Sequence, residues 1–299
     1  MNERYFYLRN INFKFMGERN MKFQFSKWHG IGNDFIIVDG SKEQIEDYNK
    51  TAIEVCDRHF GIGADGLVMI LPSEIADFKM RIFNSDGSEA EMCGNATRCI
   101  ARYLYEQKLT TKTKISIETK AGLIRPELVF KNEQLETVKV DMGEPILTAE
   151  DIPVAGSGKD RVVHKKLSIL DKSYQITCVS MGNPHCVIFV EDIDAVELEK
   201  IGPIIETHSM FPKKINVEFV EVKSKEHLRM RVWERGAGIT LACGTGSCAT
   251  IVAAVLNEKT GRSAKIELDG GDLFVEWSED NHVYLSGPAE EVFRAEYVK

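Results

Sequence analysis

Two short stretches of the chain each place a cysteine and a glycine directly before an apolar run: Cys93-Gly94-Asn95 and Cys243-Gly244-Thr245. The apolar runs predict helices, so each thiol is expected at a helix N-terminus. Unpaired backbone N–H groups and the positive end of the helix dipole stabilise anions there. We therefore expect both thiols to have a lowered pKa. The backbone N–H groups of Gly94, Asn95, Gly244 and Thr245 are candidates for holding a carboxylate.

A carboxylate bound between two such helix starts would expose its α-carbon to one sulfur on each side. One thiolate could remove the α-proton while the opposing thiol delivers a proton to the other face, which inverts the stereocentre without a cofactor. The helix ends would stabilise the enolate-like charge that develops. The remaining cysteines are expected to be small buried apolar residues: Cys56, Cys99, Cys178, Cys186 and Cys248.

The two cysteine stretches belong to an internal repeat. Cys93 and Cys243 are 150 positions apart, and the same offset aligns two further pairs of segments. These are Arg81-Ile82-Phe83 with Arg231-Val232-Trp233, and Gly32-Asn33 with Gly182-Asn183. At an offset of 149, Ile117-Glu118 aligns with Ile266-Glu267. This register indicates two homologous halves, each carrying one cysteine.

The elements that position the cysteines are predicted from residue patterning. Alternating apolar and polar residues predict many short strands in each half, with helices over 42–56, 93–107 and 195–206. The segment Ala249–Leu256 is apolar almost all round, so a helix there must be buried on every face. We predict an α+β fold of two pseudo-symmetric lobes. Each lobe is a curved, mostly antiparallel sheet wrapped around a central helix, and the active site lies in the interlobe cleft.

The domain limits follow from the repeat. Residues 1–20 precede it and are interpreted as an N-terminal extension, and residues 21–145 as the N-terminal lobe. The polar segment 146–171, which contains Gly156-Ser157-Gly158, is interpreted as a junction. Residues 172–299 then form the C-terminal lobe.

Composition excludes several classes of function. A net charge of −8 with scattered basic residues argues against a nucleic-acid partner, and no apolar run has the length of a membrane span. The first 20 residues lack the apolar region of a signal peptide. Seven cysteines without CxxC or HExxH spacing indicate neither a disulfide framework nor a metal site. We expect a cytoplasmic protein with no metal and no cofactor, whose partner is a small amino-acid substrate. A homodimer is compatible with the sequence.

Several motifs together resemble the diaminopimelate epimerase family of cofactor-independent, two-cysteine amino-acid racemases and epimerases. The resemblance runs from Met21 to the C-terminus. It rests on Lys27–Phe35, Arg81–Ser88, Met92–Cys99, Met181–Cys186, Ile215-Asn216, Trp233–Gly238 and Ala242–Gly246. It implies an isomerase that interconverts LL- and meso-diaminopimelate for lysine and peptidoglycan precursors without pyridoxal phosphate. The proline racemase branch does not share the segment His29–Phe35 and is the weaker match.

The resemblance also implies roles for individual residues. Cys93 and Cys243 resemble the catalytic pair, with Cys93 the base toward the LL isomer and Cys243 the base toward the meso isomer. His185 and Glu234 match residues that tune the thiols, and Glu234 also matches a substrate contact. Substrate-binding positions are matched by Asn33, Asn84, Asn183, Asn216 and Arg235, where Arg235 would bind the distal carboxylate. Taken singly, His185 could be a core histidine, Glu234 a salt-bridge partner, and any of the asparagines a turn residue.

Two positions depart from the family pattern, and other functions stay open. Ile239 stands where many members have Glu, and Gly66 where some have Gln. A racemase of another amino acid, such as histidine, could use the same scaffold, although Asn216 and Arg235 favour a substrate with a distal carboxylate. A thiol-redox protein or a non-catalytic binding protein is a third hypothesis, in which Cys93 and Cys243 could form a disulfide.

Overall fold

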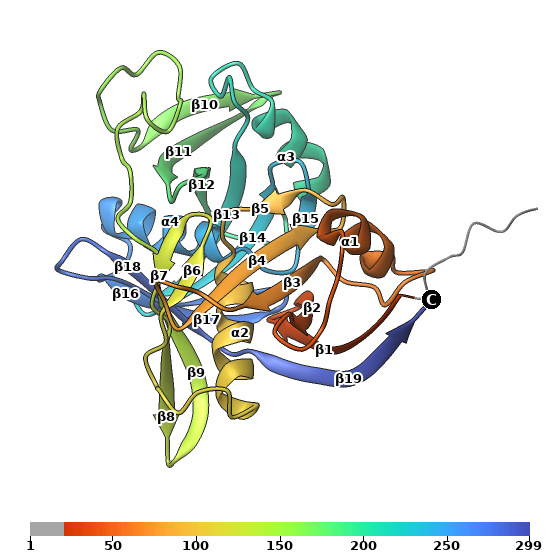
Figure 1. The fold of residues 1–299 in the computed structure, drawn as a ribbon. Coiled ribbons are helices and arrows are strands. Elements are labelled where there is room, and N and C mark those ends of the chain that lie inside the picture. Colours follow the sequence, from red (N-terminus) through yellow and green to blue (C-terminus); the bar gives the residue numbers. More distant parts are fainter. Residues whose placement is uncertain (1–20) are drawn as a thin grey trace, which may run out of the picture.

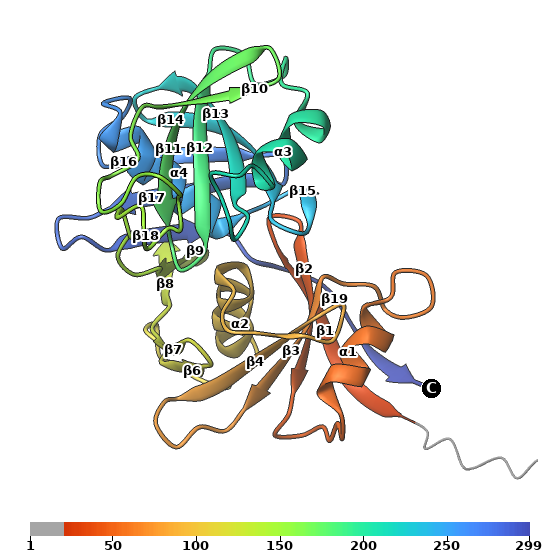
Figure 2. The ribbon, with the colours of Figure 1, turned by 90° about the horizontal axis from the view of Figure 1, so that it is seen from above.

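The computed structural model describes residues 21–299, so the predicted N-terminal extension 1–20 lies outside the described residues. Two sheets carry most of this part of the chain (Figures 1 and 2). The first sheet has the order β19-β1-β2-β3-β4-β6-β7, with β5 paired to β4. Its strands are β1 (Lys22–Gly30), β2 (Asn33–Asp39), β3 (Gly66–Leu71), β4 (Phe78–Asn84), β5 (Glu89–Ala90), β6 (Ile117–Thr119), β7 (Gly122–Ile124) and β19 (Glu290–Val298).

The second sheet has the order β10-β11-β12-β13-β14-β16-β17-β18-β9-β8, with β15 paired to β14. Its strands are β8 (Glu127–Lys131), β9 (Gln134–Asp141), β10 (Lys165–Ile169), β11 (Lys172–Ser180), β12 (Pro184–Val190), β13 (Asn216–Ser224), β14 (His227–Glu234), β15 (Gly238–Thr240), β16 (Ser263–Leu268), β17 (Gly271–Trp277) and β18 (Val283–Gly287).

The internal repeat appears in the pairing of the strands. Most neighbouring strands are antiparallel. The first sheet has the parallel pairs β2–β3 and β4–β6, and the second sheet has the parallel pairs β12–β13 and β14–β16. These pairs occupy the same places in the two halves. The predicted α+β fold with two similar lobes is therefore confirmed.

Each lobe has one central helix, α2 (Gly94–Glu106) or α4 (Gly244–Leu256), and the two begin 150 residues apart. Helix α4 packs against β11, β12, β13, β16, β17 and β18, as its all-apolar sequence predicts. Helix α2 packs against β1, β2 and β19, and also against β8 and β9 of the other sheet. Buried residues of both helices, among them Ile100 and Val252, belong to one continuous core. This shared core fixes the two helices relative to each other.

The outer helices α1 (Tyr48–Cys56) and α3 (Leu198–Glu206) are shorter than predicted. We expected a helix from residue 42, but α1 begins at Tyr48 because the side chain of Asp47 accepts a hydrogen bond from the Lys50 N–H and caps it. Among residues 21–299, no helix is both long enough and apolar enough to cross a membrane.

Hydrogen bonding between strands crosses the domain limits that the sequence predicts. Strand β9, from the first half, pairs with β18 of the second sheet, and the C-terminal strand β19 pairs with β1 of the first (Figure 1). Packing explains the position of β19, because Tyr297 and Phe293 lie against Phe23 and Phe25 of β1, with ring centroids 5.3 and 5.8 Å apart. The limits themselves stay a prediction.

The predicted junction 146–171 is packed into the structure of the second half. Its apolar residues Ile152, Val154 and Val162 are buried in one cluster with Ile176 and Ile188 of β11 and β12. The segment also contributes β10, which pairs with β11. The segment is polar overall, so its composition did not indicate that these few apolar side chains anchor it.

Candidate active site

Both cysteines stand immediately before the central helices. Cys93 is the N-cap residue of α2 and Cys243 that of α4, and both have extended backbone conformations, with φ of −143° and −130°. The two helix starts face each other closely, since a Cβ built on Gly244 would lie 3.9 Å from Asn95 Oδ1. The fold thus brings together the N–H groups of both helix starts. These are the groups that the sequence indicates as candidates for holding a carboxylate.

One carboxylate acts on both thiols. Glu234, at the end of β14, raises the pKa of Cys93 and the pKa of Cys243, although each cysteine comes from a different half. Its Oε1 accepts a hydrogen bond from Thr240 Oγ1 of β15. The two thiols therefore share one electrostatic neighbour.

The prediction that both thiols have a lowered pKa is wrong for this structure. Burial is the largest influence on each thiol, and it raises the pKa of Cys93 and raises that of Cys243 well above its ordinary value. The N–H groups of Asn95 and Ala96 oppose this effect at Cys93, and the N–H of Gly246 opposes it at Cys243, from 3.4 Å. The helix-end effect is present, but desolvation of the thiolate outweighs it.

In the first half, the Cys93 thiol lies in a group of amides. Cys93 Sγ donates to Asn33 Oδ1 at 3.8 Å, and Asn95 Nδ2 donates to the same oxygen at 3.0 Å. Asn33 in turn donates from Nδ2 to Asp65 Oδ2 at 2.7 Å, which fixes the orientation of its amide. Asn33 and Asn95 are therefore brought to Cys93, as the sequence predicts.

The orientation of Asn33 depends on an ion-pair cluster behind it. Asp34 pairs with Lys27 Nζ at 2.7 Å and with Arg58 Nη2 at 2.8 Å, and Arg58 also pairs with Asp65. Burial raises the pKa of Asp34, but the hydrogen bonds from Arg58 and Lys27 outweigh it and lower the pKa from 3.8 to about 2. The cluster joins β1, β2 and the loop before β3.

This cluster predicts acid-sensitive stability. The folded-state pKa of Asp34 is lowered, so its contribution is complete above pH 3.8 and disappears as the pH falls toward about 2. We expect a loss of about 1–2 kcal/mol from this group over that interval, because Arg58 is half exposed and solvent screens part of the interaction. Urea unfolding of wild type and Asp34→Asn at pH 5, 4, 3 and 2 measures it. The variant should lose less stability on acidification, and equal losses would contradict the assignment.

In the second half, Asn183 and Thr245 take the corresponding places. Asn183 Nδ2 donates to Thr245 Oγ1 at 3.2 Å, and that hydroxyl lies 3.7 Å from Cys243 Sγ. His185 Nε2 lies 3.0 Å from Asn183 Oδ1, and the ring is fully buried. His185 therefore reaches Cys243 through Asn183 and Thr245 in this structure.

Glu218 is the site residue that the sequence reasoning missed. Its carboxylate is fully buried on β13, and Oε1 lies 2.6 Å from His185 Nδ1. The available signal was strand periodicity: Glu218 is two residues after Asn216, on the same face of the strand, and its neighbours Val217, Phe219 and Val220 are apolar. A carboxylate at such a position is buried, and it needs a partner.

Three residues assigned to the distal end of a substrate have no hydrogen bond to either cysteine among the described residues. Asn216 is buried, accepts from the Arg235 N–H at 2.9 Å and donates to the Pro184 carbonyl at 2.8 Å. Arg235 Nη1 donates to the Lys213 carbonyl at 3.2 Å, and Asn84 Nδ2 donates to Ser88 Oγ at 2.9 Å. The side chains of Arg235 and Asn84 are exposed and accessible to a ligand.

The two residues that depart from the family pattern, Gly66 and Ile239, lie on strands. Gly66 pairs with Asn84 across β3 and β4, and a Cβ on Gly66 would lie 3.0 Å from the Phe83 carbonyl oxygen. Ile239 lies on β15 and is partly exposed. Neither residue takes part in the hydrogen bonds around Cys93 and Cys243.

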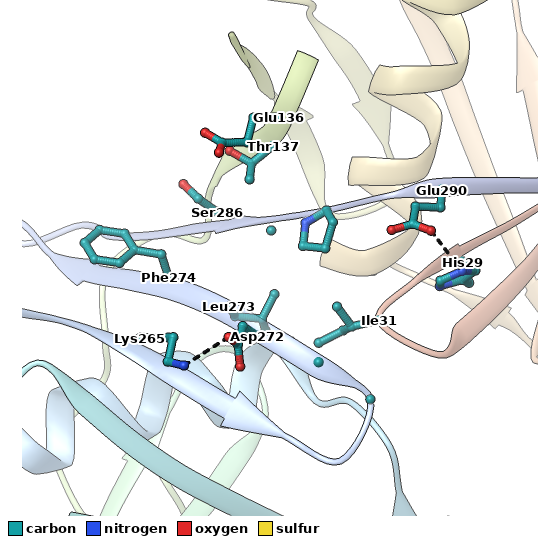
Figure 3. A pocket seen from close by; sticks show the side chains of 14 residues that line it. His29, Ile31, Glu136, Thr137, Lys265, Asp272, Leu273, Phe274, Ser286 and Glu290 are labelled. Atoms are coloured by element: carbon teal, nitrogen blue, oxygen red, sulfur yellow. Dashed lines mark hydrogen bonds and ion pairs between the residues drawn. The ribbon is translucent and has the colours of Figure 1, made fainter. Parts of the chain in front are cut away.

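A cavity of about 790 Å³ is lined by residues of both sheets (Figure 3). His29, Ile31, Phe274 and Glu290 are among the residues that line it, and the ion pairs His29–Glu290 and Lys265–Asp272 lie at its wall. Neither Cys93 nor Cys243 lines it. We place the candidate active site at the two helix starts, where the nucleophilic side chains are.

Comparisons with known proteins match most of this chain to one family. The diaminopimelate epimerase family model matches residues 25–148 and 177–292. A diaminopimelate epimerase of Pelotomaculum thermopropionicum is 57% identical over 275 residues, which cover 91% of this chain and 98% of that protein. One from Methanococcus maripaludis strain C5 is 56% identical, with coverage of 91% and 99%.

Solved structures are similar in fold at much lower identity. A phenazine biosynthesis protein of the PhzF family from Bacillus anthracis has a TM-score of 0.68 and 19% identity, covering 92% of this chain and 99% of that chain. A hydroxyproline epimerase of Agrobacterium vitis with bound trans-4-hydroxy-L-proline has a TM-score of 0.64 and 14% identity, with coverage of 93% and 91%. From the family match and the curated relatives, this chain belongs to the diaminopimelate epimerase family.

Proposed function

We propose that this protein catalyses the reversible inversion of LL-diaminopimelate to meso-diaminopimelate, with Cys93 and Cys243 as opposed bases. The observation that carries the proposal is the meeting of two matched helix starts, each with a cysteine as its N-cap residue. Relatives that are 51–57% identical over about nine-tenths of the chain are diaminopimelate epimerases, so the substrate class and the isomerase activity follow from the family.

The reaction needs a carbon acid to lose a proton near neutral pH. The N–H groups of Gly94, Asn95, Gly244 and Thr245 would hold the α-carboxylate and stabilise the enolate-like charge. For the LL isomer, the Cys93 thiolate takes the α-proton and the Cys243 thiol gives its proton to the opposite face of the same carbon. The products are meso-diaminopimelate, a Cys93 thiol and a Cys243 thiolate, and exchange with solvent restores the starting forms.

The desolvation of the two thiols suits this reaction because it makes a thiolate a stronger base. Asn33 and Asn183 would line the site beside the two sulfurs, at equivalent positions of the repeat. Arg235 would pair with the distal carboxylate of the substrate, and Asn84 and Asn216 would support that end. Glu234 would oppose a second negative charge, so that only one of the two thiols is ionised at a time.

The test is turnover of LL-diaminopimelate in deuterated water by the reduced protein. We expect meso-diaminopimelate that carries deuterium at the inverted centre only, measured by chiral chromatography and mass spectrometry. Absence of both exchange and inversion would overturn the proposal. The same assay with histidine and proline tests the neighbouring racemase hypothesis. The thiol-redox or binding alternative predicts that the protein functions without inverting diaminopimelate, and replacing one cysteine by serine separates this case from the epimerase.

We extend the proposal to a cytoplasmic location and to a homodimer. Proton transfer by thiols requires both cysteines to stay reduced, and the cytoplasm keeps protein thiols reduced. Sedimentation of the purified full-length protein measures the oligomeric state, and a monomer at micromolar concentration would contradict the homodimer.

A further inference from the structure

A buried charged side chain lies behind each of the two cysteines, and the two side chains have opposite charges. Behind Cys93 the buried group is Arg98, and behind Cys243 it is Glu218. The repeat does not duplicate either one. At the offset of 150 residues, Arg98 corresponds to Cys248 and Glu218 corresponds to Val68. The matched thiols therefore have unmatched electrostatic surroundings.

Arg98 is a buried cation that no carboxylate neutralises among residues 21–299. Its side chain is fully buried, Nη2 donates to Asn95 Oδ1 at 2.8 Å and Nε donates to the Pro288 carbonyl at 3.2 Å. Nη1 is buried and has no hydrogen-bond partner in the described residues. Asn95 Nδ2 donates to Asn33 Oδ1, and that oxygen lies 3.8 Å from Cys93 Sγ. A thiolate at Cys93 would supply the negative charge that this guanidinium lacks, and Arg98 lowers the pKa of Cys93.

Glu218 is a buried anion close to the other sulfur. A Cβ built on Gly246 would lie 2.9 Å from Glu218 Oε1 and 3.1 Å from Cys243 Sγ, so the carboxylate and the thiol flank the same glycine. Oε1 is bound to His185, whereas Oε2 is buried without a hydrogen-bond partner in the described part of the chain. Burial raises the pKa of Glu218, and Glu218 in turn raises the pKa of Cys243.

The charged groups that face each thiol can be compared directly. Cys93 faces Arg98 from its own helix and Glu234 from β14. Cys243 faces Glu234 from β14 and Glu218 from β13, and His185 of β12 lies beyond Glu218. Glu234 opposes ionisation of both thiols, so the difference between them comes from Arg98 on one side and from Glu218 with His185 on the other.

We propose that Arg98 and Glu218 are positioning residues that set the resting state of the enzyme, with a thiolate at Cys93 and a thiol at Cys243. This inference rests on the proposed function, because it states which of the two proton distributions the free enzyme holds. In that state Cys93 is ready to take a proton and Cys243 is ready to give one. After one turnover the distribution is reversed, and solvent exchange returns the proton to Cys243.

His185 and Asn183 carry the effect of Glu218 to the site. Asn183 directs Nδ2 to Thr245, so its Oδ1 faces His185 and requires a proton on Nε2. A proton on Nε2 is compatible with the contact at the other ring nitrogen, where Glu218 Oε1 lies against Nδ1. Oε1 and Nδ1 can share a second proton between them. The same contacts hold the Thr245 hydroxyl beside Cys243.

The experiment measures each thiol without using turnover. The full-length protein is alkylated with iodoacetamide over pH 5–10, and mass spectrometry gives the rate at Cys93 and at Cys243 separately. In wild type we expect the pH midpoint for Cys93 to be lower than that for Cys243 by about one unit or more. In Glu218→Gln the Cys243 midpoint should fall by about one unit while that of Cys93 stays unchanged. In Arg98→Met the Cys93 midpoint should rise.

Glu221→Gln is the matched control, because Glu221 lies on the same strand but pairs with Lys223 at 2.6 Å. It should leave both midpoints where they are in wild type. Thermal melting checks folding, and if Arg98→Met does not fold, Glu218→Gln decides the question alone. Equal midpoints in wild type, or a Cys243 midpoint unchanged in folded Glu218→Gln, would overturn the inference. Failure of the proposed function would appear differently, as wild type that does not invert diaminopimelate whatever its alkylation pattern.

Discussion

Replacing Cys243 by alanine is expected to reduce the inversion of diaminopimelate by about 10³-fold or more, since a positioned proton donor or acceptor contributes about 10²–10⁴-fold and this variant loses one of two. The Cys93 thiolate can still take a proton from the LL isomer, but it can return one only to the same face. We therefore expect Cys243→Ala to exchange deuterium into LL-diaminopimelate without forming the meso isomer. Cys93→Ala should do the reverse, exchanging deuterium into the meso isomer.

The measurement is the deuterium content and configuration of each isomer over time in deuterated water. Cys248→Ala is the control. Cys248 lies on α4 and is fully buried, but no hydrogen bond joins it to the described site residues. This variant should keep activity close to that of wild type. Inversion by Cys243→Ala at more than a tenth of the wild-type rate would contradict the opposed-base mechanism.

Gly270→Ala is expected to damage both stability and activity. A Cβ at this position would lie 2.0 Å from the Ile31 carbonyl oxygen and 3.0 Å from the Leu241 carbonyl oxygen. Both obstacles are backbone atoms, so the segments themselves must move apart. Ile31 belongs to the β1–β2 turn just before Asn33, and Leu241 lies two residues before Cys243. We expect a loss of about 1–3 kcal/mol of stability from overpacking.

The same displacement should reach the chemistry, because it separates the segments that carry Asn33 and Cys243. A misplacement on the order of 1 Å reduces turnover by about 10²-fold. Thermal melting and kcat/KM for LL-diaminopimelate measure the two effects. Gly261→Ala is the control, since a Cβ there meets no atom within 4 Å and its φ is not in the left-handed region. A Gly270→Ala protein as stable and active as Gly261→Ala would show that the two segments move independently.

The β1–β2 turn, which Gly270 approaches closely, has an unusual backbone conformation. Ile31 has a φ of +49° and Gly32 a φ of +88°, so both central residues of the β1–β2 turn are left-handed. For a β-branched residue this conformation is strained. The side chain of Ile31 is nevertheless buried, at 3% exposed, and packs against Gly271 of the other sheet. Contact between the lobes therefore holds a conformation that the local sequence disfavours.

Local patterning determined much of this protein. The offset of 150 residues, the helices that begin after Cys93 and Cys243 and the all-apolar run of α4 were each predictable, because such signals depend on neighbours in the chain. The motifs around them were sufficient to identify the family. Asn33, Asn95, Asn183 and Thr245 were expected near the thiols, and the structure places them there.

Only the tertiary structure decided the electrostatics and the exchange of strands. Whether a helix end lowers a thiol pKa depends on how much water the packed lobes exclude, and no spacing of residues reveals that. Strand periodicity could indicate a buried Glu218 but not its partner His185, and the burial of Arg98 follows from elements distant in the chain. Likewise, β9 and β19 cross to the opposite sheets because edges far apart in sequence meet in space. Pairing and burial are properties of the assembled chain, so local patterns could not predict them.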